Sequence, residues 1–166
     1  MKDYLLDTNI IHHFARFKMG ISTPQSEKIK SKLSQISDKS KILICAISIG
    51  EMEYGYNVAD TKAKADVQQL CDHIKNYEIL SIDQEIARDH YAEIRAILFE
   101  NYAPRNEKKK RRLTEWADPI SDKNIQVQEN DIWICAVAKY YNLTLITDDK
   151  MEAIRKVTNL DIQNWI

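Results

Sequence analysis

The sequence predicts an α/β fold, a three-layer α/β/α sandwich in which helices cover both faces of a central, mostly parallel sheet of four to five strands. Short apolar or β-branched runs recur along the chain, as expected of strands that are buried on both faces. Segments of helical length and apolar repeat separate these runs. The 166 residues, of which 44% are hydrophobic, can build one core, so we expect a single domain over residues 1–166.

The expected elements follow one another in alternation. Strands are predicted at residues 5–6, 41–45, 78–82 and 143–147, with a final strand at 160–164. Helices are predicted at residues 9–18, 23–37, 47–58, 62–76, 83–100 and 131–141. Residues 132–138 are apolar throughout, so the periodicity there fits a buried strand or a buried helix equally. We choose a helix because a segment of about eleven residues has the average helix length.

Residues 101–126 interrupt the alternation with two prolines and a basic run, and we interpret them as an inserted loop with a short helix around 111–116. The basic run is a candidate RNA-binding segment, because cations near a nucleic-acid backbone supply affinity. A solvated loop explains the same composition equally well. The run comprises Lys108, Lys109, Lys110, Arg111 and Arg112.

The composition excludes several classes of function. A formal net charge of -1 argues against a protein that coats nucleic acid non-specifically, so any such contact must be local. Gly20, Gly50 and Gly55 are the only glycines, and their positions allow neither a P-loop nor a dinucleotide-binding turn. The three cysteines fit buried reduced thiols, and no signal peptide or membrane span is evident, so we expect a cytoplasmic protein.

Four carboxylates, those of Asp7, Glu51, Asp131 and Asp149, follow strand-like runs or lie near predicted helix starts. Each has a structural explanation when taken alone. Asp7, Asp131 and Asp149 can cap helices, and residues 48–51 match a capping box. Together they are more informative, because all strand-to-helix junctions of a parallel sheet open on one edge. Clustered carboxylates repel one another, and a divalent cation would relieve that repulsion.

His12 and His13 form the most obvious alternative metal pair. Neighbouring side chains of a helix point apart, however, so two adjacent histidines cannot readily share one ion. We therefore assign both histidines a structural or surface role.

Four short motifs resemble those of the PIN-domain ribonucleases, and specifically the VapC-type toxins of bacterial toxin–antitoxin pairs. They are the segments at residues 5–9, 51–55, 130–136 and 145–149, which read LLDTN, EMEYG, NDIWICA and LITDD. Each motif is weak alone, but the four occur in the family's order, and the match from the first to the last spans almost the whole chain.

The resemblance implies a PIN-like fold with one or two Mg²⁺ or Mn²⁺ ions held by Asp7, Glu51, Asp131 and Asp149. It implies supporting roles for Thr8, Asn9 and Thr147, and it leaves Asp148 as an alternative to Asp149. It further implies cleavage of RNA, a homodimer, and inhibition by a small antitoxin protein.

We therefore expect a metal-dependent endoribonuclease, the toxin of a toxin–antitoxin pair, in which an activated water attacks an RNA phosphate. In this hypothesis Asp7 and Asp131 hold the main ion, and Glu51 and Asp149 complete the site or hold a second ion. Two alternatives stay open. One is an inactive PIN-like module that binds RNA or protein, and the other is a nuclease that acts on DNA flaps.

Overall fold

The computed structural model describes residues 2–104 and 112–166, except for the side chains of residues 61 and 62. Of the predicted RNA-binding run, Arg112 is exposed, and Lys108, Lys109, Lys110 and Arg111 lie outside the described residues. No helix in this described part of the chain is both long enough and apolar enough to cross a membrane.

Internal contacts divide the chain into two compact units. The first comprises Met1–Ser81, Leu143–Asp149 and Ile162–Ile166, and the second comprises Ile82–Asn142 and Lys150–Asp161. The single domain over residues 1–166 stays a prediction.

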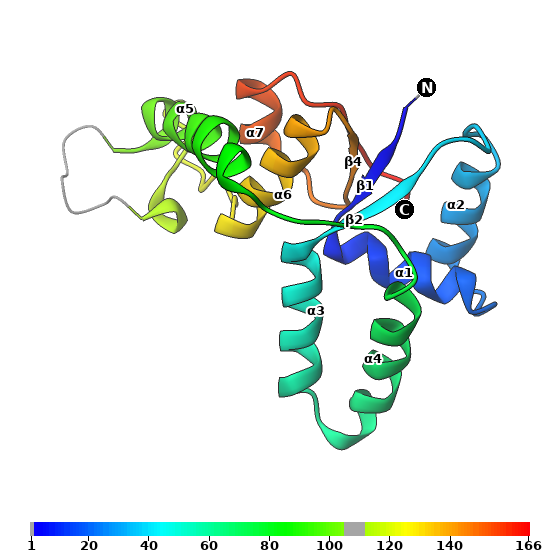
Figure 1. Ribbon diagram of the computed structural model, residues 1–166. Helices are drawn as coiled ribbons and strands as arrows, with labels where there is room; N and C mark the ends of the chain where they lie inside the picture. The colour runs from blue at the N-terminus through cyan, green and yellow to red at the C-terminus, as the bar shows by residue number, and fades with distance from the viewer. Residues whose placement is uncertain (1, 105–111) are drawn as a thin grey trace. The chain divides into compact units, whose positions relative to one another are not determined.

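The first unit contains a parallel sheet of five strands, which confirms the predicted α/β class and strand number. The strands are β1 (Tyr4–Leu6), β2 (Ile42–Cys45), β3 (Ile79–Leu80), β4 (Thr144–Ile146) and β5 (Ile162–Gln163). Their order in the sheet is β3-β2-β1-β4-β5, and β1 lies between β2 and β4 (Figure 1). All residues of β1 and β4 are buried, which explains why both strands read as continuous hydrophobic runs.

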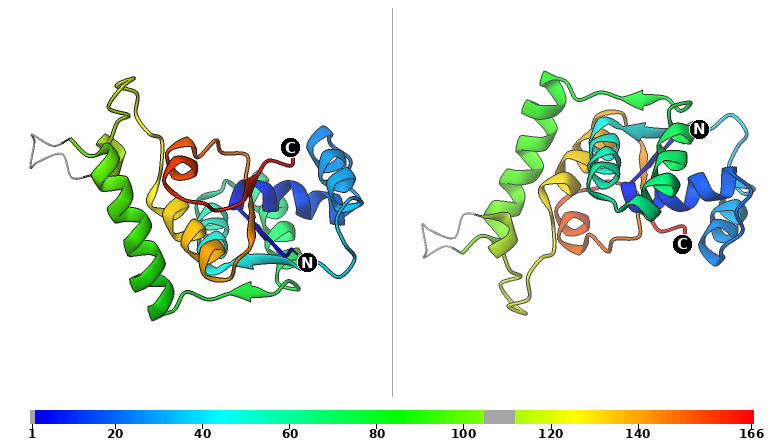
Figure 2. Two further views of the ribbon diagram at one scale, coloured as in Figure 1. Left: turned by 90° about the horizontal axis from the view of Figure 1, so that it is seen from above. Right: turned by 90° about the horizontal axis from the view of Figure 1, so that it is seen from below.

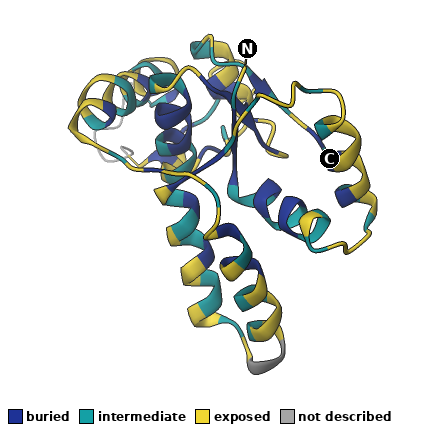
Figure 3. Ribbon diagram, turned by 45° about the vertical axis from the view of Figure 1, so that its right-hand side comes forward, coloured by how far each residue is buried: buried dark blue, intermediate teal, exposed yellow. Residues whose placement is uncertain are grey.

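Four helices belong to the same unit: α1 (Thr8–Lys18), α2 (Pro24–Leu33), α3 (Ala46–Val58) and α4 (Thr61–Ile74). Helices α1 and α2 lie next to each other in all three views of Figures 1 and 2. Helices α3 and α4 form a hairpin whose residues are mostly exposed or half-buried at the end away from the sheet (Figure 3).

The predicted capping box at residues 48–51 is wrong. Helix α3 already begins at Ala46, with Cys45 as its N-cap residue, because the chain turns into the helix directly after β2. Ser48 is therefore inside the first turn, where it is fully buried and its hydroxyl lies 3.5 Å from the Cys45 Sγ. A capping box does form at the start of α2, between Thr23 and Ser26.

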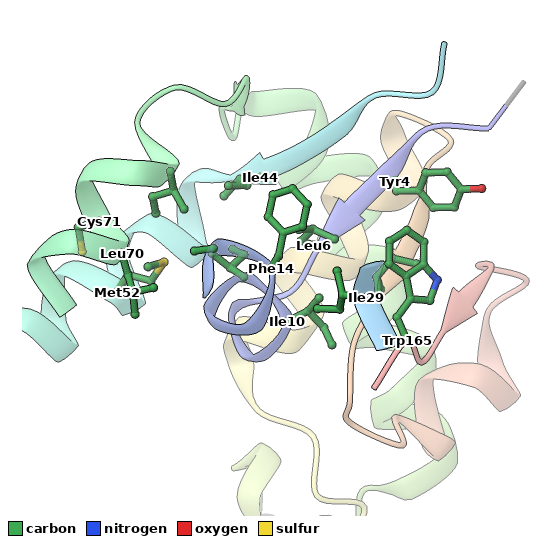
Figure 4. Close-up of a cluster of buried hydrophobic side chains, with 14 residues drawn as sticks. Tyr4, Leu6, Ile10, Phe14, Ile29, Ile44, Met52, Leu70, Cys71 and Trp165 are labelled. Carbon is green, nitrogen blue, oxygen red and sulfur yellow. The ribbon is translucent and has the colours of Figure 1, made fainter. Parts of the chain in front are cut away.

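The core of the first unit forms where α1 packs on the sheet. Phe14 and Ile10 of α1 meet Leu6 of β1 in a cluster that includes Ile44 of β2 (Figure 4). The same cluster includes Tyr4 and Trp165, whose ring centroids lie 5.2 Å apart. This packing fixes the start of α1 against the end of β1.

The second unit is helical. It contains a π-helical segment at Ile86–Tyr91, α5 (Ala92–Tyr102), a 3₁₀ turn at Leu113–Glu115, α6 (Glu129–Tyr140) and α7 (Glu152–Val157). The π-helical segment packs on α6, and the Tyr91 ring stacks on Trp133 with centroids 3.8 Å apart. The helix predicted at 83–100 is confirmed as helical backbone from residue 84 to 102, with the π-helical segment inside it. The sequence missed the short α7, and it correctly placed a short helix within the 101–126 insertion.

Candidate functional site

The order of the strands produces a switch point in the sheet between β1 and β4. The chain runs from β1 outward through β2 and β3 on one side, and β4 and β5 lie on the other side. Ligands of open parallel sheets bind outside the carboxyl ends of the strands at such a point. Asp7 follows β1 directly, and Thr147, Asp148 and Asp149 follow β4. The sequence prediction that these residues share one edge of the sheet is therefore confirmed.

Asp7 lies at the centre of this edge and is 4% exposed. Its Oδ1 accepts a hydrogen bond of 2.7 Å from the Thr8 backbone N–H, so it caps α1 as predicted. Its Oδ2 accepts a 2.6 Å hydrogen bond from the Thr147 hydroxyl. One carboxylate therefore joins the end of β1 to the end of β4.

Thr147 and Asn9 extend this connection into a network. The Thr147 hydroxyl, which is fully buried, also accepts from Asn9 Nδ2 at 3.2 Å and from the Asp149 backbone N–H at 3.1 Å. Asn9 Oδ1 accepts from the Asp148 backbone N–H at 3.2 Å. The loop after β4 is thus held to the first turn of α1 by side chains of three different kinds.

The structure distinguishes Asp148 from Asp149, which the motif alone did not. Asp149 Oδ2 accepts a 3.0 Å hydrogen bond from Asn9 Nδ2, and its charge acts on Asp7. Asp148 Oδ1 instead accepts a 2.8 Å hydrogen bond from Asn164 Nδ2, just beyond β5. The Asp149 carboxylate is therefore the one connected to the Asp7 network through side chains.

Glu51 reaches the same edge from α3. Its Oε2 accepts a hydrogen bond from the hydroxyl of Thr8, the first residue of α1. Helical side chains tilt toward the N-terminus, so a long Glu in the second turn of α3 can reach back to the end of the sheet. Its charge is among those that act on Asp7.

The electrostatics of Asp7 are those of a buried acid among other acids. Burial raises the pKa of the Asp7 carboxyl above its ordinary value of 3.8, and the charges of Asp149 and Glu51 raise it further. The hydrogen bonds from Thr147 and Thr8 act in the opposite direction because they stabilise the ionised form.

This set of groups suits a hard divalent cation, which prefers oxygen ligands and would favour the ionised form of Asp7. Among the residues that the structure describes, no three His, Cys, Asp or Glu side chains stand close enough together to hold an ion as they are. Binding an ion would therefore require the carboxylates to draw together, with some hydrogen bonds from Thr8, Asn9 and Thr147 exchanged.

Asp131 belongs to the second unit, where it is the third residue of α6. Its Oδ2 accepts a 2.7 Å hydrogen bond from the Gln128 backbone N–H, as part of a capping box. Helix α6 therefore begins at Glu129, two residues before the predicted start at residue 131. The place of Asp131 among the metal ligands stays a prediction from its motif.

Sequence reasoning missed Asn164. Its contact with Asp148 depends on the pairing of β5 with β4, in which Ile146 lies opposite Gln163. Nothing in the sequence around residue 164 signals this role, because the partner lies 16 residues away and only the sheet register brings the two together.

The fold and the site define an α/β protein with an acidic, oxygen-rich site at the switch point of a parallel sheet. The family model of the PIN domain matches residues 4–159. The chain therefore belongs to the PIN domain family, as its motifs predicted. A search of curated proteins finds no matching relative.

Several solved structures share the fold. VapBC2 from Rickettsia felis, crystallised with a DNA fragment from its promoter, is 21% identical with a TM-score of 0.68 and 98% of each chain covered. DNA-bound VapBC from Salmonella typhimurium is 19% identical with a TM-score of 0.67 over 100% of each chain. VapBC-5 from Mycobacterium tuberculosis, a toxin–antitoxin system, is 21% identical with a TM-score of 0.61, covering 99% of this chain and 98% of that chain.

Proposed function

We propose that this PIN-domain protein is a divalent-metal-dependent endoribonuclease and the toxin of a toxin–antitoxin pair. The observation that carries the proposal is the buried Asp7 carboxylate, bonded to Thr147 and under the charges of Asp149 and Glu51 at the switch point. A buried acid among acids destabilises a protein unless a cation binds there, so a structural role alone explains it poorly.

In this proposal Asp7, Glu51, Asp149 and Asp131 hold one or two Mg²⁺ or Mn²⁺ ions. Such an ion lowers the pKa of an attacking water and offsets the charge that develops on the phosphate. Thr147 fixes the orientation of Asp7 by its 2.6 Å hydrogen bond, and Thr8 fixes Glu51 by its hydroxyl. Asn9 positions Asp149 through its amide. These donors are neutral, so they orient the carboxylates in the empty site without placing a competing positive charge there.

The partner is proposed on the likeness to VapBC structures, one of which is described as a toxin–antitoxin system. We propose a small antitoxin protein as the inhibitor of this chain, a homodimer as its assembly, and the cytoplasm as its location. Co-expression with the product of a small neighbouring reading frame, followed by co-purification and loss of nuclease activity, tests the antitoxin.

The experiment that tests the activity is cleavage of a total RNA pool by the purified protein, with Mn²⁺ and with a chelator. Asp149→Asn should lower cleavage by at least about a hundredfold, since even an outer hydrogen-bond partner of a metal ligand is worth 10- to 100-fold. Asp148→Asn removes the same charge one residue away and should retain most of the activity. Equal loss in both variants would contradict the assignment of Asp149.

Asp131→Asn tests whether Asp131, which is assigned to the metal site by its sequence motif alone, is needed for cleavage. The amide oxygen can still accept the hydrogen bond from the Gln128 backbone, so the helix should fold as before while RNA cleavage collapses. An Asp131→Asn variant with wild-type activity would remove Asp131 from the site.

Two outcomes would favour the other functions. If diverse RNAs stay intact with Mn²⁺ and calorimetry detects no metal binding, the chain is a PIN-like binding module. If a branched DNA flap is cut and RNA is spared, the substrate is DNA.

A further inference from the structure

Helix α1 carries a polar face that begins at the acidic site. Its buried residues are Ile10, Ile11, Phe14 and Ala15, which pack into the core. Asn9, His13 and Arg16 follow at spacings of four and three residues, so their side chains lie one above another on the opposite side of the helix. All three are half-buried and so remain partly accessible to solvent.

The first residue of this face is part of the acidic site. Asn9 donates to Asp149 at 3.0 Å and accepts from the Asp148 backbone N–H. With a rise of about 1.5 Å per residue, His13 lies about 6 Å and Arg16 about 10 Å farther along the helix axis. That length corresponds to about three stacked nucleotides of a single strand, at about 3.4 Å each.

The charge of Arg16 is not used inside the described part of the chain. Arg95 is paired with Glu129, and Arg88 is 2.8 Å from Asp89, whereas Arg16 has no carboxylate within ion-pair distance among the described residues. A guanidinium presents a planar set of donors that matches the oxygens of a phosphate. Arg16 is therefore available to an anion from outside.

His13 lies between Asn9 and Arg16 along this face. Burial and then the charge of Arg16 lower the pKa of His13, while the charge of Asp148 raises it, so the ring is within electrostatic reach of both. Its Nδ1 is buried and has no hydrogen-bond partner among the described residues. The earlier assignment of His13 to a structural role leaves this nitrogen unexplained.

We propose that His13 and Arg16 bind the phosphate backbone of a single-stranded RNA next to the cleavage site, Arg16 through its charge and His13 as a neutral hydrogen-bonding ring, with Asn9 marking the boundary between this polar face and the acidic site. The inference rests on the proposed function, because it assigns the path of the substrate of that same site. The acidic site itself repels a polyanion, and the neighbouring positive charge of Arg16 on α1 offsets part of that repulsion.

A structural alternative is that Arg16 only complements the dipole at the end of α1. Lys18 provides a matched control, since it lies in the same last turn and carries the same charge. Its ammonium is 5.5 Å from the Phe14 ring centroid and 5.6 Å from that of Phe17, on the other side of the helix. Lys18→Gln therefore removes the same contribution to the dipole and leaves the polar face intact.

The test compares Arg16→Gln, His13→Gln and Lys18→Gln with the wild type, using a fluorescein-labelled single-stranded RNA that the wild type cleaves. Cleavage is measured with Mn²⁺, and binding is measured by anisotropy with Ca²⁺ at several salt concentrations. Arg16→Gln should raise KM by about tenfold and change kcat by less than about twofold. The substitution removes a charged hydrogen bond that stabilises the bound substrate and the transition state equally. The slope of log affinity against log salt should fall by about one.

His13→Gln should also raise KM, by a smaller factor, and Lys18→Gln should leave both KM and the salt slope at the wild-type values. Equal KM values and equal slopes for Arg16→Gln and Lys18→Gln, in a wild type that cleaves RNA, would overturn this inference alone. A wild type that neither cleaves nor binds RNA would overturn both this inference and the proposed function. Thermal unfolding of each variant verifies that the fold is kept.

Discussion

Replacing Thr147 with Val tests whether the acidic site is held together as described. Valine has nearly the shape of threonine but has no hydroxyl, so Asp7 loses its 2.6 Å hydrogen bond. Thr147 is fully buried, so water cannot readily take the place of the hydroxyl. We expect Thr147→Val to destabilise the protein and Thr147→Ser, which keeps the hydroxyl, to do so much less.

The expected change in the free energy of unfolding follows from the hydrogen bonds that Thr147→Val removes. A hydrogen bond to a charged group contributes about 1.5–3 kcal/mol. Asn9 Nδ2 also loses Thr147 as an acceptor, but it keeps Asp149 at 3.0 Å, and the Asp149 N–H is only partly buried. We therefore expect a loss of about 2 kcal/mol, or about 4–8 °C in the midpoint of thermal unfolding for a chain of this size.

The loss should depend on pH. Burial already raises the pKa of Asp7 in the folded chain above its ordinary 3.8, and removing the Thr147 hydroxyl raises it further. Where the folded pKa exceeds the unfolded one, the folded chain binds more protons between the two values, so stability falls as pH rises through that interval. The wild type and Thr147→Val should therefore differ least below pH 3.8, where Asp7 is protonated in both states. The difference should grow as pH rises through the folded pKa.

Urea unfolding followed by circular dichroism at several pH values measures this dependence. The Asp7→Asn background provides the control, since without a carboxylate at position 7 the Thr147→Val substitution should have a much smaller effect. The reasoning is refuted if Thr147→Val costs the same free energy in both backgrounds, or the same at every pH.

Three further predictions concern the same region. Asn9→Ala should lower RNA cleavage with Mn²⁺ by about 10- to 100-fold, measured as kcat/KM, because Asn9 positions Asp149. Mn²⁺ at about 100 times its Kd should stabilise the protein by about 2.7 kcal/mol in calorimetric unfolding, and Asp7→Asn should abolish this gain. Leu6→Ala should cost about 2–5 kcal/mol in urea unfolding, because Leu6 is fully buried beneath α1. A stable Leu6→Ala protein would show that the core at the end of β1 can collapse around the cavity.

The sequence was most informative where local pattern decides structure. The strands that became β1, β2 and β4 are continuous apolar runs, and Asp7 follows the first of them at the start of a helix with a clear 3.6-residue repeat. Their junctions had to meet on one edge because the strands are parallel. The hydrogen bond between Thr147 and Asp7 forms for the same reason, because each residue directly follows one of two neighbouring parallel strands.

Features that depend on sheet register or on exact helix starts could not be read in this way. Asn164 meets Asp148 only because β5 pairs with β4 in one register. Ser48 matched a capping box by sequence, but α3 starts two residues earlier and encloses it. Helix α7 has only six residues, and its N-cap Met151 adopts a left-handed conformation with φ 46° and no side-chain cap. Such a start has no sequence signal.

The chemistry of the donors around the acids is compatible with a site that folds without a bound cation and, in the proposed function, binds an exchangeable ion. Thr147, Thr8 and Asn9 donate to Asp7, Glu51 and Asp149 respectively, and all three donors are neutral. A lysine or arginine in their place would lower the pKa of Asp7 and stabilise the empty site, but it would occupy the position of a cation. Neutral donors orient the carboxylates and leave their mutual repulsion largely in place. That repulsion is the free energy that a divalent ion would relieve on binding.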